Sequence, residues 1–192
     1  MKARFVMITA FSTFLAATGT AQQAAAPAAQ PGPNTGDAAP AFTGKGADKS
    51  GTLAKAISLA DLKGKTVVLA FFPAARTSGC TTQMTGYRDQ YEKLFMGGKN
   101  VVLLGISTDA DTTLHNWAKE ANFPFQFVSD DGSIGRAYGT LDDSRKTERR
   151  FVYVISPDGK ISYVKKPFSP NTPPQYEELG AEVHKAMGSH HE

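Results

Sequence analysis

The sequence predicts an α/β fold in which a central mixed sheet is flanked by helices. Short apolar runs rich in β-branched and aromatic residues recur along the chain, as is typical of strands covered on both faces. Between and after these runs, apolar residues recur three and four positions apart, which indicates amphipathic helices. The resulting order is strand, helix, strand, helix, hairpin, helix. This order favours a sheet that is parallel at first and ends in an antiparallel hairpin.

Four strands are expected. The first, 66–72 (TVVLAFF), is a nearly continuous apolar run that a proline ends, and 101–107 (VVLLGIS) is a second run of the same kind. Residues 151–156 (FVYVIS) and 160–164 (KISYV) flank a Pro-Asp-Gly turn. They are therefore expected to pair as a hairpin.

Three helices are expected, over 80–95, 111–120 and 173–187. The second begins with an Asp-Thr-Thr sequence that is typical of a helix cap. The third opens with two prolines, which the first turn of a helix tolerates. The residues expected to face the core from these helices are Met84, Tyr87, Tyr91, Leu94, Leu114, Trp117, Ala118, Tyr176, Leu179, Val183 and Met187.

The first 21 residues (1–21) have the features of a secretory signal peptide. Lys2 and Arg4 supply a positive start, residues 5–17 an apolar centre, and 19–21 a small-residue cleavage site. The apolar run is too short for a comfortable membrane span, although an uncleaved anchor is the alternative. We therefore expect an exported, periplasmic protein that is not held in the membrane after cleavage.

The remaining sequence divides into three parts. Residues 22–40, rich in Ala, Pro and Gln, lack the large apolar side chains of a core and are expected to be a flexible leader. The folded domain is expected over 41–187, followed by a disordered tail over 188–192. The formal charge is +3 at pH 7, and two of these charges lie in the signal peptide. A balance so close to neutral does not indicate nucleic acid as a partner.

Cys80 is the only cysteine of the 192 residues. An intrachain disulfide, a zinc finger, an iron–sulfur cluster and a C-x-x-C exchange site are therefore excluded. Cys80 follows the end of a predicted strand, where α/β sheets bind ligands, and lies in the first turn of a predicted helix, where free N–H groups favour an anion such as a thiolate. Thr77 adds a hydroxyl three residues earlier. The alternative is that Cys80 is a small buried core residue.

The stretch PAARTSGC, with Pro73, Thr77 and Cys80, matches the P-x-x-x-T-x-x-C signature of peroxiredoxins. The longer stretch SGCTTQMTGYRDQY is similar to the PrxQ, or bacterioferritin-comigratory, branch of this AhpC/TSA superfamily, and the resemblance extends over about residues 36–165. It implies a thioredoxin-like fold, in agreement with the predicted order of elements. It also implies a site arginine, which RRFVYVISPDG places at Arg150.

The resemblance implies a thiol-dependent peroxidase acting on hydrogen peroxide and organic hydroperoxides. The Cys80 thiolate would attack the peroxide and become a sulfenic acid. Arg150 and the backbone N–H at Cys80 would stabilise charge on the leaving oxygen. Thr77 would hold the peroxide in line, and Pro73 would wall the pocket against water. No metal or organic cofactor is required.

The charged segment before the hairpin contributes only Arg150 to the expected site. Strand alternation sends Arg149 and Arg150 to opposite faces. Residues 142–149 are expected to form a solvated charged loop.

The sequence departs from the family pattern at three places in and beside the site. Ser78 stands where the family often has a proline. Thr85 stands where PrxQ-type proteins often have a second cysteine, so an external thiol or thioredoxin-like partner is expected to reduce Cys80. Gln83 stands where the family usually has a glutamate.

Two alternative functions remain open. One is a redox-sensing or binding protein of the same fold that reacts without turnover. The other is a thiol–disulfide exchange protein that would have to work without the usual C-x-x-C pair, since Thr77 stands in place of its first cysteine. The preferred peroxide, and the choice between monomer and homodimer, remain open as well.

Overall fold

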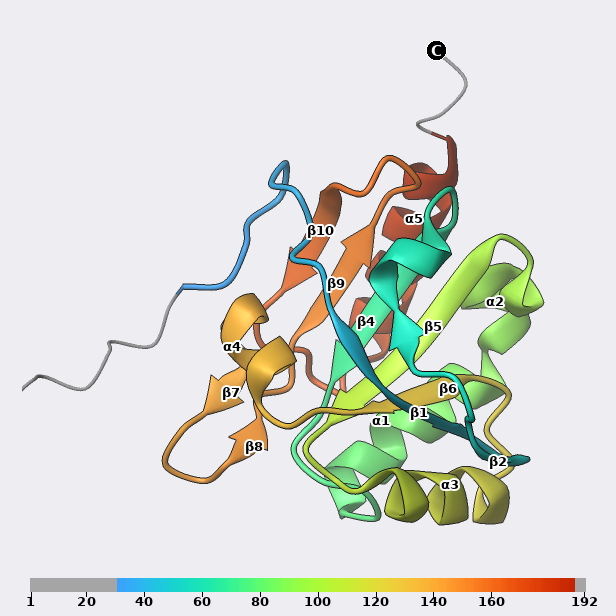
Figure 1. Cartoon of the computed structure of the whole chain (residues 1–192). Coiled ribbons are helices and arrows are strands. Elements are labelled where there is room, and N and C mark those ends of the chain that lie inside the picture. The colour runs from blue at the N-terminus through green and yellow to red at the C-terminus, as the bar shows by residue number, and fades with distance from the viewer. Residues whose placement is uncertain (1–30, 189–192) are drawn as a thin grey trace, which may run out of the picture.

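A computed structural model describes residues 31–188. Its central sheet has eight strands in the order β10-β9-β4-β5-β6-β1-β2, with β3 paired to β1 (Figure 1). Strands β4, β5 and β6 are parallel to one another, β9 and β1 run against them, and β10 runs against β9. The strands are β1 Thr43–Asp48, β2 Gly51–Thr52, β3 Ile57–Ser58, β4 Thr66–Phe71, β5 Val101–Ser107, β6 Gln126–Ser129, β9 Val152–Ile155 and β10 Ile161–Lys165. A separate two-stranded sheet pairs β7 Leu141–Asp142 with β8 Thr147–Glu148.

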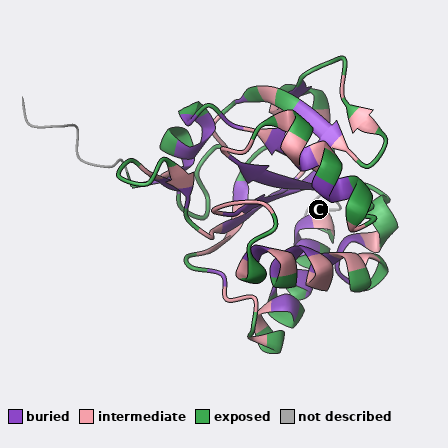
Figure 2. Cartoon of the chain, turned by 90° about the horizontal axis from the view of Figure 1, so that it is seen from below, coloured by how far each residue is buried: buried purple, intermediate pink, exposed green. Residues whose placement is uncertain are grey.

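Helices cover both faces of the sheet, and Figure 2 shows the buried strands between them. The α-helices are α1 Ser78–Asp89, α2 Tyr91–Phe95, α3 Asp111–Glu120, α4 Ser133–Tyr138 and α5 Pro173–Gly188. The 3-10 helices are η1 Leu59–Leu62 and η2 Met96–Gly98. Side chains of α1, α2, α3 and α5 form one core with the sheet, and those of α4 and η1 pack in a second core on the other face.

Strand β4 lies in the middle because it has no polar face. All six of its residues are buried. Alternate side chains enter the two cores: Val68 and Ala70 face the first, whereas Val67 and Leu69 face the second. The prediction of a central strand covered on both sides is therefore confirmed, as is the mixed α/β sheet.

The local predictions differ from the structure in ways that have physical causes. The expected helix over 80–95 is two helices that meet at Gln90, whose φ of −112° and ψ of 19° interrupt the helical path. Met187 is half-buried, and Ala186 takes the last core position of α5. Strands β1, β2, β3, β6, β7 and β8 and helix α4 were not predicted, because they are short or rich in Gly and polar residues and have no clear apolar period.

The folded chain begins earlier than predicted. Ala38 bridges to Lys160, and the N–H of Gly36 donates to the carbonyl of Ile161 at 2.8 Å. Gly32 packs so closely that a Cβ there would lie 1.8 Å from the carbonyl oxygen of Tyr138. Residues 31–40 therefore belong to the domain, and the start at 41 is corrected. A Pro/Gly-rich segment can dock through its backbone without supplying core side chains.

The other predictions about the ends of the chain fall mostly on residues that the structure does not describe. These are the signal peptide, the first part of the leader and residues 189–192. Within 31–188, no helix is long and apolar enough to cross a membrane.

Candidate active site

Cys80 occupies the place that the sequence predicts. Strand β4 ends at Phe71, a short loop follows, and Cys80 is the third residue of α1. Its side chain is fully buried and faces the core formed by α1, α2, α3 and α5. Burial alone would fit a structural cysteine, so the neighbours of the sulfur decide between the two interpretations.

Arg150 lies against that sulfur. Its Nη2 donates a hydrogen bond to Sγ of Cys80 at 3.3 Å. The backbone that carries Arg150 lies two residues before β9, and its carbonyl accepts from the N–H of Phe168 at 2.8 Å. Gly79 leaves room for the guanidinium, since a Cβ there would lie 3.1 Å from Nη2. Arg149 is exposed and Arg150 is half-buried, so the two side chains differ as expected, but both precede β9 and strand alternation is not the cause.

Two further side chains, which were not among the predicted site residues, extend the contact into the core. Gln83, one turn after Cys80 on the same helix face, accepts from Nη1 of Arg150 through Oε1 at 2.5 Å. Its Nε2 donates to the hydroxyl of Tyr87 at 3.1 Å. Both side chains are fully buried, and burial raises the pKa of Tyr87 well above its usual range. The i, i+3 spacing from Cys80 was the signal that could have found Gln83.

Pro73 and Thr77 lie near the two ends of the loop between β4 and α1. Thr77 is the exposed N-cap residue of α1, and its hydroxyl donates to the carbonyl of Ala74 at 2.9 Å rather than capping the helix. Pro73 is half-buried directly after the strand. In the part of the chain that the structure describes, Cys80 and Arg150 are thus in direct contact, and the Thr77 hydroxyl is not hydrogen-bonded to either.

The loop before α1 is held by polar contacts from the neighbouring strand and helix. Asp109, just after β5, accepts from the N–H of Ala75 at 2.8 Å and from the hydroxyl of Ser107 at 2.9 Å. Arg76 has a φ of 64°, and its guanidinium forms two hydrogen bonds to the carboxylate of Glu120 at 2.8 and 3.1 Å. These contacts fix the backbone that leads to Cys80.

The charged segment before Arg150 is solvated except at one residue. Residues 143–146 are exposed as predicted, but Glu148 is only 1% exposed, so the prediction of a solvated loop is wrong at that position. One carboxyl oxygen accepts from the Thr140 hydroxyl, and the other has no hydrogen-bond partner. Burial raises the pKa of Glu148 to about 8, and the neighbouring Asp130 carboxylate adds to that increase.

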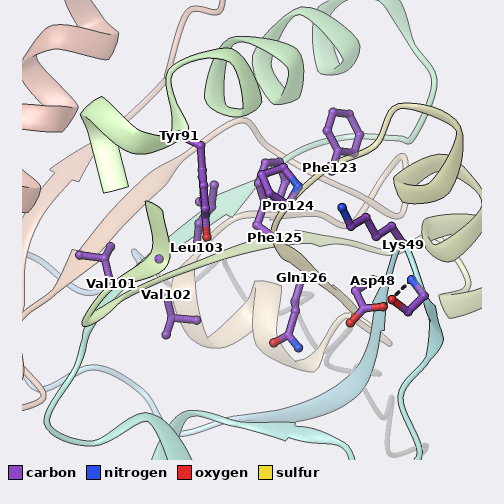
Figure 3. Close-up of a pocket in the computed structure, with 12 residues that line it drawn as sticks. Asp48, Lys49, Tyr91, Val101, Val102, Leu103, Phe123, Pro124, Phe125 and Gln126 are labelled. Carbon is purple, nitrogen blue, oxygen red and sulfur yellow. Dashed lines mark hydrogen bonds between the residues drawn. The ribbon is translucent and has the colours of Figure 1, made fainter. Parts of the chain in front are cut away.

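The pocket in Figure 3 lies elsewhere. It has a volume of about 290 Å³ and lies between Tyr91, Phe125 and Lys49, beside Val101 at the start of β5. Cys80 follows the end of β4, which is parallel to β5, so the pocket and the cysteine lie at opposite ends of the strands. Within 31–188, no three His, Cys, Asp or Glu side chains are grouped so as to hold a metal ion.

Comparison with known proteins points to one family. The model of the AhpC/TSA family matches residues 35–164. A chloroplastic peroxiredoxin Q of Populus jackii is 39% identical over 133 residues, covering 68% of this chain and 59% of the relative. A putative peroxiredoxin bcp of Coxiella burnetii is 36% identical over 115 residues, covering 56% of this chain and 75% of the relative. The chain thus spans about three fifths of the length of the first of these relatives.

Solved structures agree on the fold. The peroxidoxin BcpB from Mycobacterium tuberculosis superposes with a TM-score of 0.66 at 27% identity, covering 79% of this chain and 96% of that one. AhpC of Enterococcus faecalis superposes with a TM-score of 0.68 at 20% identity, covering 81% of this chain and 95% of that one, and supports the fold alone.

Proposed function

The chain belongs to the AhpC/TSA family, and from this premise we propose that it is a thiol-dependent peroxidase in which Cys80 is the reacting group. The relatives it resembles are named peroxiredoxins. The observation that carries the proposal is the hydrogen bond of 3.3 Å from Arg150 Nη2 to Cys80 Sγ. A fixed positive charge at that distance favours the thiolate, which is the nucleophilic form of cysteine.

The site supports oxidation of the thiolate by a hydroperoxide. Sulfur attacks the terminal oxygen, an S–O bond forms and the O–O bond breaks. The departing oxygen leaves as hydroxide or alkoxide and takes up a proton, so that one thiol and one hydroperoxide give one sulfenic acid and one water or alcohol. Arg150 is permanently charged and lies where the developing negative charge needs a donor.

The resting state must be restored by thiols from outside the chain, because Cys80 is the only cysteine. One external thiol condenses with the sulfenic acid, releasing water and leaving a mixed disulfide. A second thiol displaces Cys80 and carries away a disulfide. A small thiol or a thioredoxin-like protein fits this role. The side chain at position 85, one turn beyond Thr81 on α1, is a threonine and supplies no resolving sulfur.

Thr77 and Pro73 complete the proposed catalytic group. The Thr77 hydroxyl can turn from the Ala74 carbonyl towards a bound peroxide, and Pro73 restricts the approach of water beside the strand end. We place this activity in an exported, periplasmic protein, on the strength of the signal-like features of residues 1–21. Monomer and homodimer are both compatible with a site built from a single chain.

Intact-mass spectrometry of the purified protein and of Cys80→Ser, mixed with hydrogen peroxide or an organic hydroperoxide, tests the proposal. The expected result is rapid addition of one oxygen atom to wild type only, reversed by dithiothreitol with continued loss of peroxide. Addition no faster than that to a free small thiol would refute the proposal. A fast adduct without continued peroxide loss would instead identify a single-use sensor.

A further inference from the structure

Gln83 is an uncharged residue that contacts both Arg150 and Tyr87 beside Cys80. Its amide lies between the guanidinium of Arg150 and the hydroxyl of Tyr87, with hydrogen bonds of 2.5 and 3.1 Å. The side chain is fully buried, so neither contact is exchanged with bulk water. The result is a continuous chain of hydrogen bonds from Tyr87 through Gln83 and Arg150 to Cys80.

The orientation of the amide follows from its two partners. Arg150 offers only donors, so the oxygen of Gln83 must face it. The amide nitrogen then faces Tyr87, whose oxygen accepts. A reversed amide would place donor against donor at Arg150, and burial would make that arrangement costly. Tyr87 therefore fixes Gln83, and Gln83 fixes one end of the guanidinium.

The second observation is that no negative charge among the described residues offsets the positive charge of Arg150. Among residues 31–188, no carboxylate lies in ion-pair contact with Arg150. Besides Arg150, the titratable groups that interact electrostatically with Tyr87 of α1 are Tyr176 of α5 and Tyr163 of β10, so three tyrosines bear on this end of the site. Burial raises the pKa of each of them, to about 12 for Tyr176, so all three are neutral near pH 7. The positive charge of Arg150 is thus not shared with a buried anion.

From this geometry we propose that Gln83 is a positioning residue whose neutral amide holds Arg150 against Cys80 and leaves the full guanidinium charge to stabilise the thiolate. A carboxylate at position 83 would make the same hydrogen bond but would add a negative charge near the sulfur and oppose thiolate formation. A side chain without an acceptor would leave the guanidinium free to turn away. The inference deepens the proposed peroxidase function and concerns the same site.

Gln83→Glu tests the role of charge, with alkylation of Cys80 by iodoacetamide as the measurement. This reaction reports the thiolate and requires no peroxidase turnover. We expect alkylation at pH 7 to be about tenfold slower in the variant, with its pH profile moved to more alkaline values. Thr82→Glu is the matched control, because it adds the same charge to an exposed position on the same helix. Its alkylation rate is expected to lie within about twofold of wild type.

Gln83→Met tests the role of the anchor. Methionine has a similar length and no charge but cannot accept a strong hydrogen bond from Arg150. We expect alkylation to slow by about threefold, since the charged donor is no longer held at the sulfur. Thermal unfolding of each variant verifies that it is folded, and Gln83→Met decides the question if Gln83→Glu does not fold.

The proposal is overturned if a folded Gln83→Glu protein alkylates at the wild-type rate, or if Gln83→Met does so. Failure of the peroxidase function has a different signature. In that case wild type would not consume peroxide, while the alkylation rates would still differ between the variants.

Discussion

The guanidinium of Arg150 lies 3.3 Å from the sulfur of Cys80, although 70 residues separate them in the sequence. This contact gives the buried thiol a permanent positive neighbour among the side chains of the first core, most of which are apolar. It favours the proposed reactive cysteine over a small core residue, because a core cysteine has no need of a charged donor. The contact forms because β4, which leads to α1, and β9, which follows Arg150, are neighbouring strands.

Arg150→Met is expected to slow oxidation of Cys80 by hydrogen peroxide by about 10²-fold, because the charge that stabilises the leaving oxygen is lost. Stopped-flow measurement of the reaction under single-turnover conditions provides the rate. Arg149→Met is the control, since Arg149 is adjacent in sequence but exposed. Equal rates for the two variants would contradict the assignment of Arg150 to the site.

Glu148→Gln is expected to remove part of the pH dependence of stability. The pKa of Glu148 is raised from its usual value of 4.5 to about 8 in the folded state. Between these pH values the folded chain retains a proton that the unfolded chain releases. The free energy of unfolding therefore falls as pH rises, by up to about 1.4 kcal/mol per pH unit, and levels off above pH 8.

Urea denaturation at pH 5.5, 7.0 and 8.5 measures this effect. The stability of Glu148→Gln relative to wild type is expected to increase with pH across that range. Glu177→Gln, which changes an exposed carboxyl on α5, is the control and is expected to follow wild type. A constant difference between Glu148→Gln and wild type would show that Glu148 does not hold an extra proton.

Asp109→Ala is expected to loosen the loop that leads to Cys80. The N–H of Ala75 and the hydroxyl of Ser107 would both lose their acceptor, which costs about 1–3 kcal/mol for partly buried groups. Oxidation of Cys80 is expected to slow as well, because the start of α1 is less well placed. Hydrogen exchange of the loop amides, together with the oxidation rate, measures both effects.

Glu120→Gln serves as the comparison for that experiment. It weakens the contact of Arg76 with α3, but both side chains are exposed, and little change in stability is expected. If Glu120→Gln loosened the loop as much as Asp109→Ala, the loop would be held from its surface and not by Asp109.

Gly32→Ala is expected to lower the free energy of unfolding by about 1–3 kcal/mol, because the added Cβ would overlap the Tyr138 carbonyl at 1.8 Å. Gly51→Ala is the control, as nothing lies within 4 Å of the position that its Cβ would take. Thermal unfolding of both variants tests whether residues 31–40 belong to the folded domain. If Gly32→Ala and wild type unfold identically, residues 31–40 are part of the leader and not of the folded domain.

The sequence by itself determined the elements with strong local patterns. The bounds of β5 and α3 agree with the predicted 101–107 and 111–120, since a continuous apolar run and an amphipathic stretch carry their own periodicity. The predicted Asp-Thr-Thr cap is wrong, because Ala110 is the N-cap residue of α3 and no side chain caps the helix. The sequence also placed Cys80 at a junction of strand and helix, because the strand before it and the helix after it each have a clear local pattern. Strands β1, β2, β3 and β6 could not be found, because their stability comes from pairing rather than from composition.

Only the tertiary structure decided which polar groups meet. The sequence marks Arg150 by resemblance, but its contact with Cys80 requires β4 and β9 to be neighbours in the sheet. Gln83 contacts Arg150, and Glu148 is buried, because packing of distant elements excludes water from both side chains. Local sequence sets the direction of a side chain along its own helix or strand. The partner that the side chain meets is set by long-range packing, which no local period records.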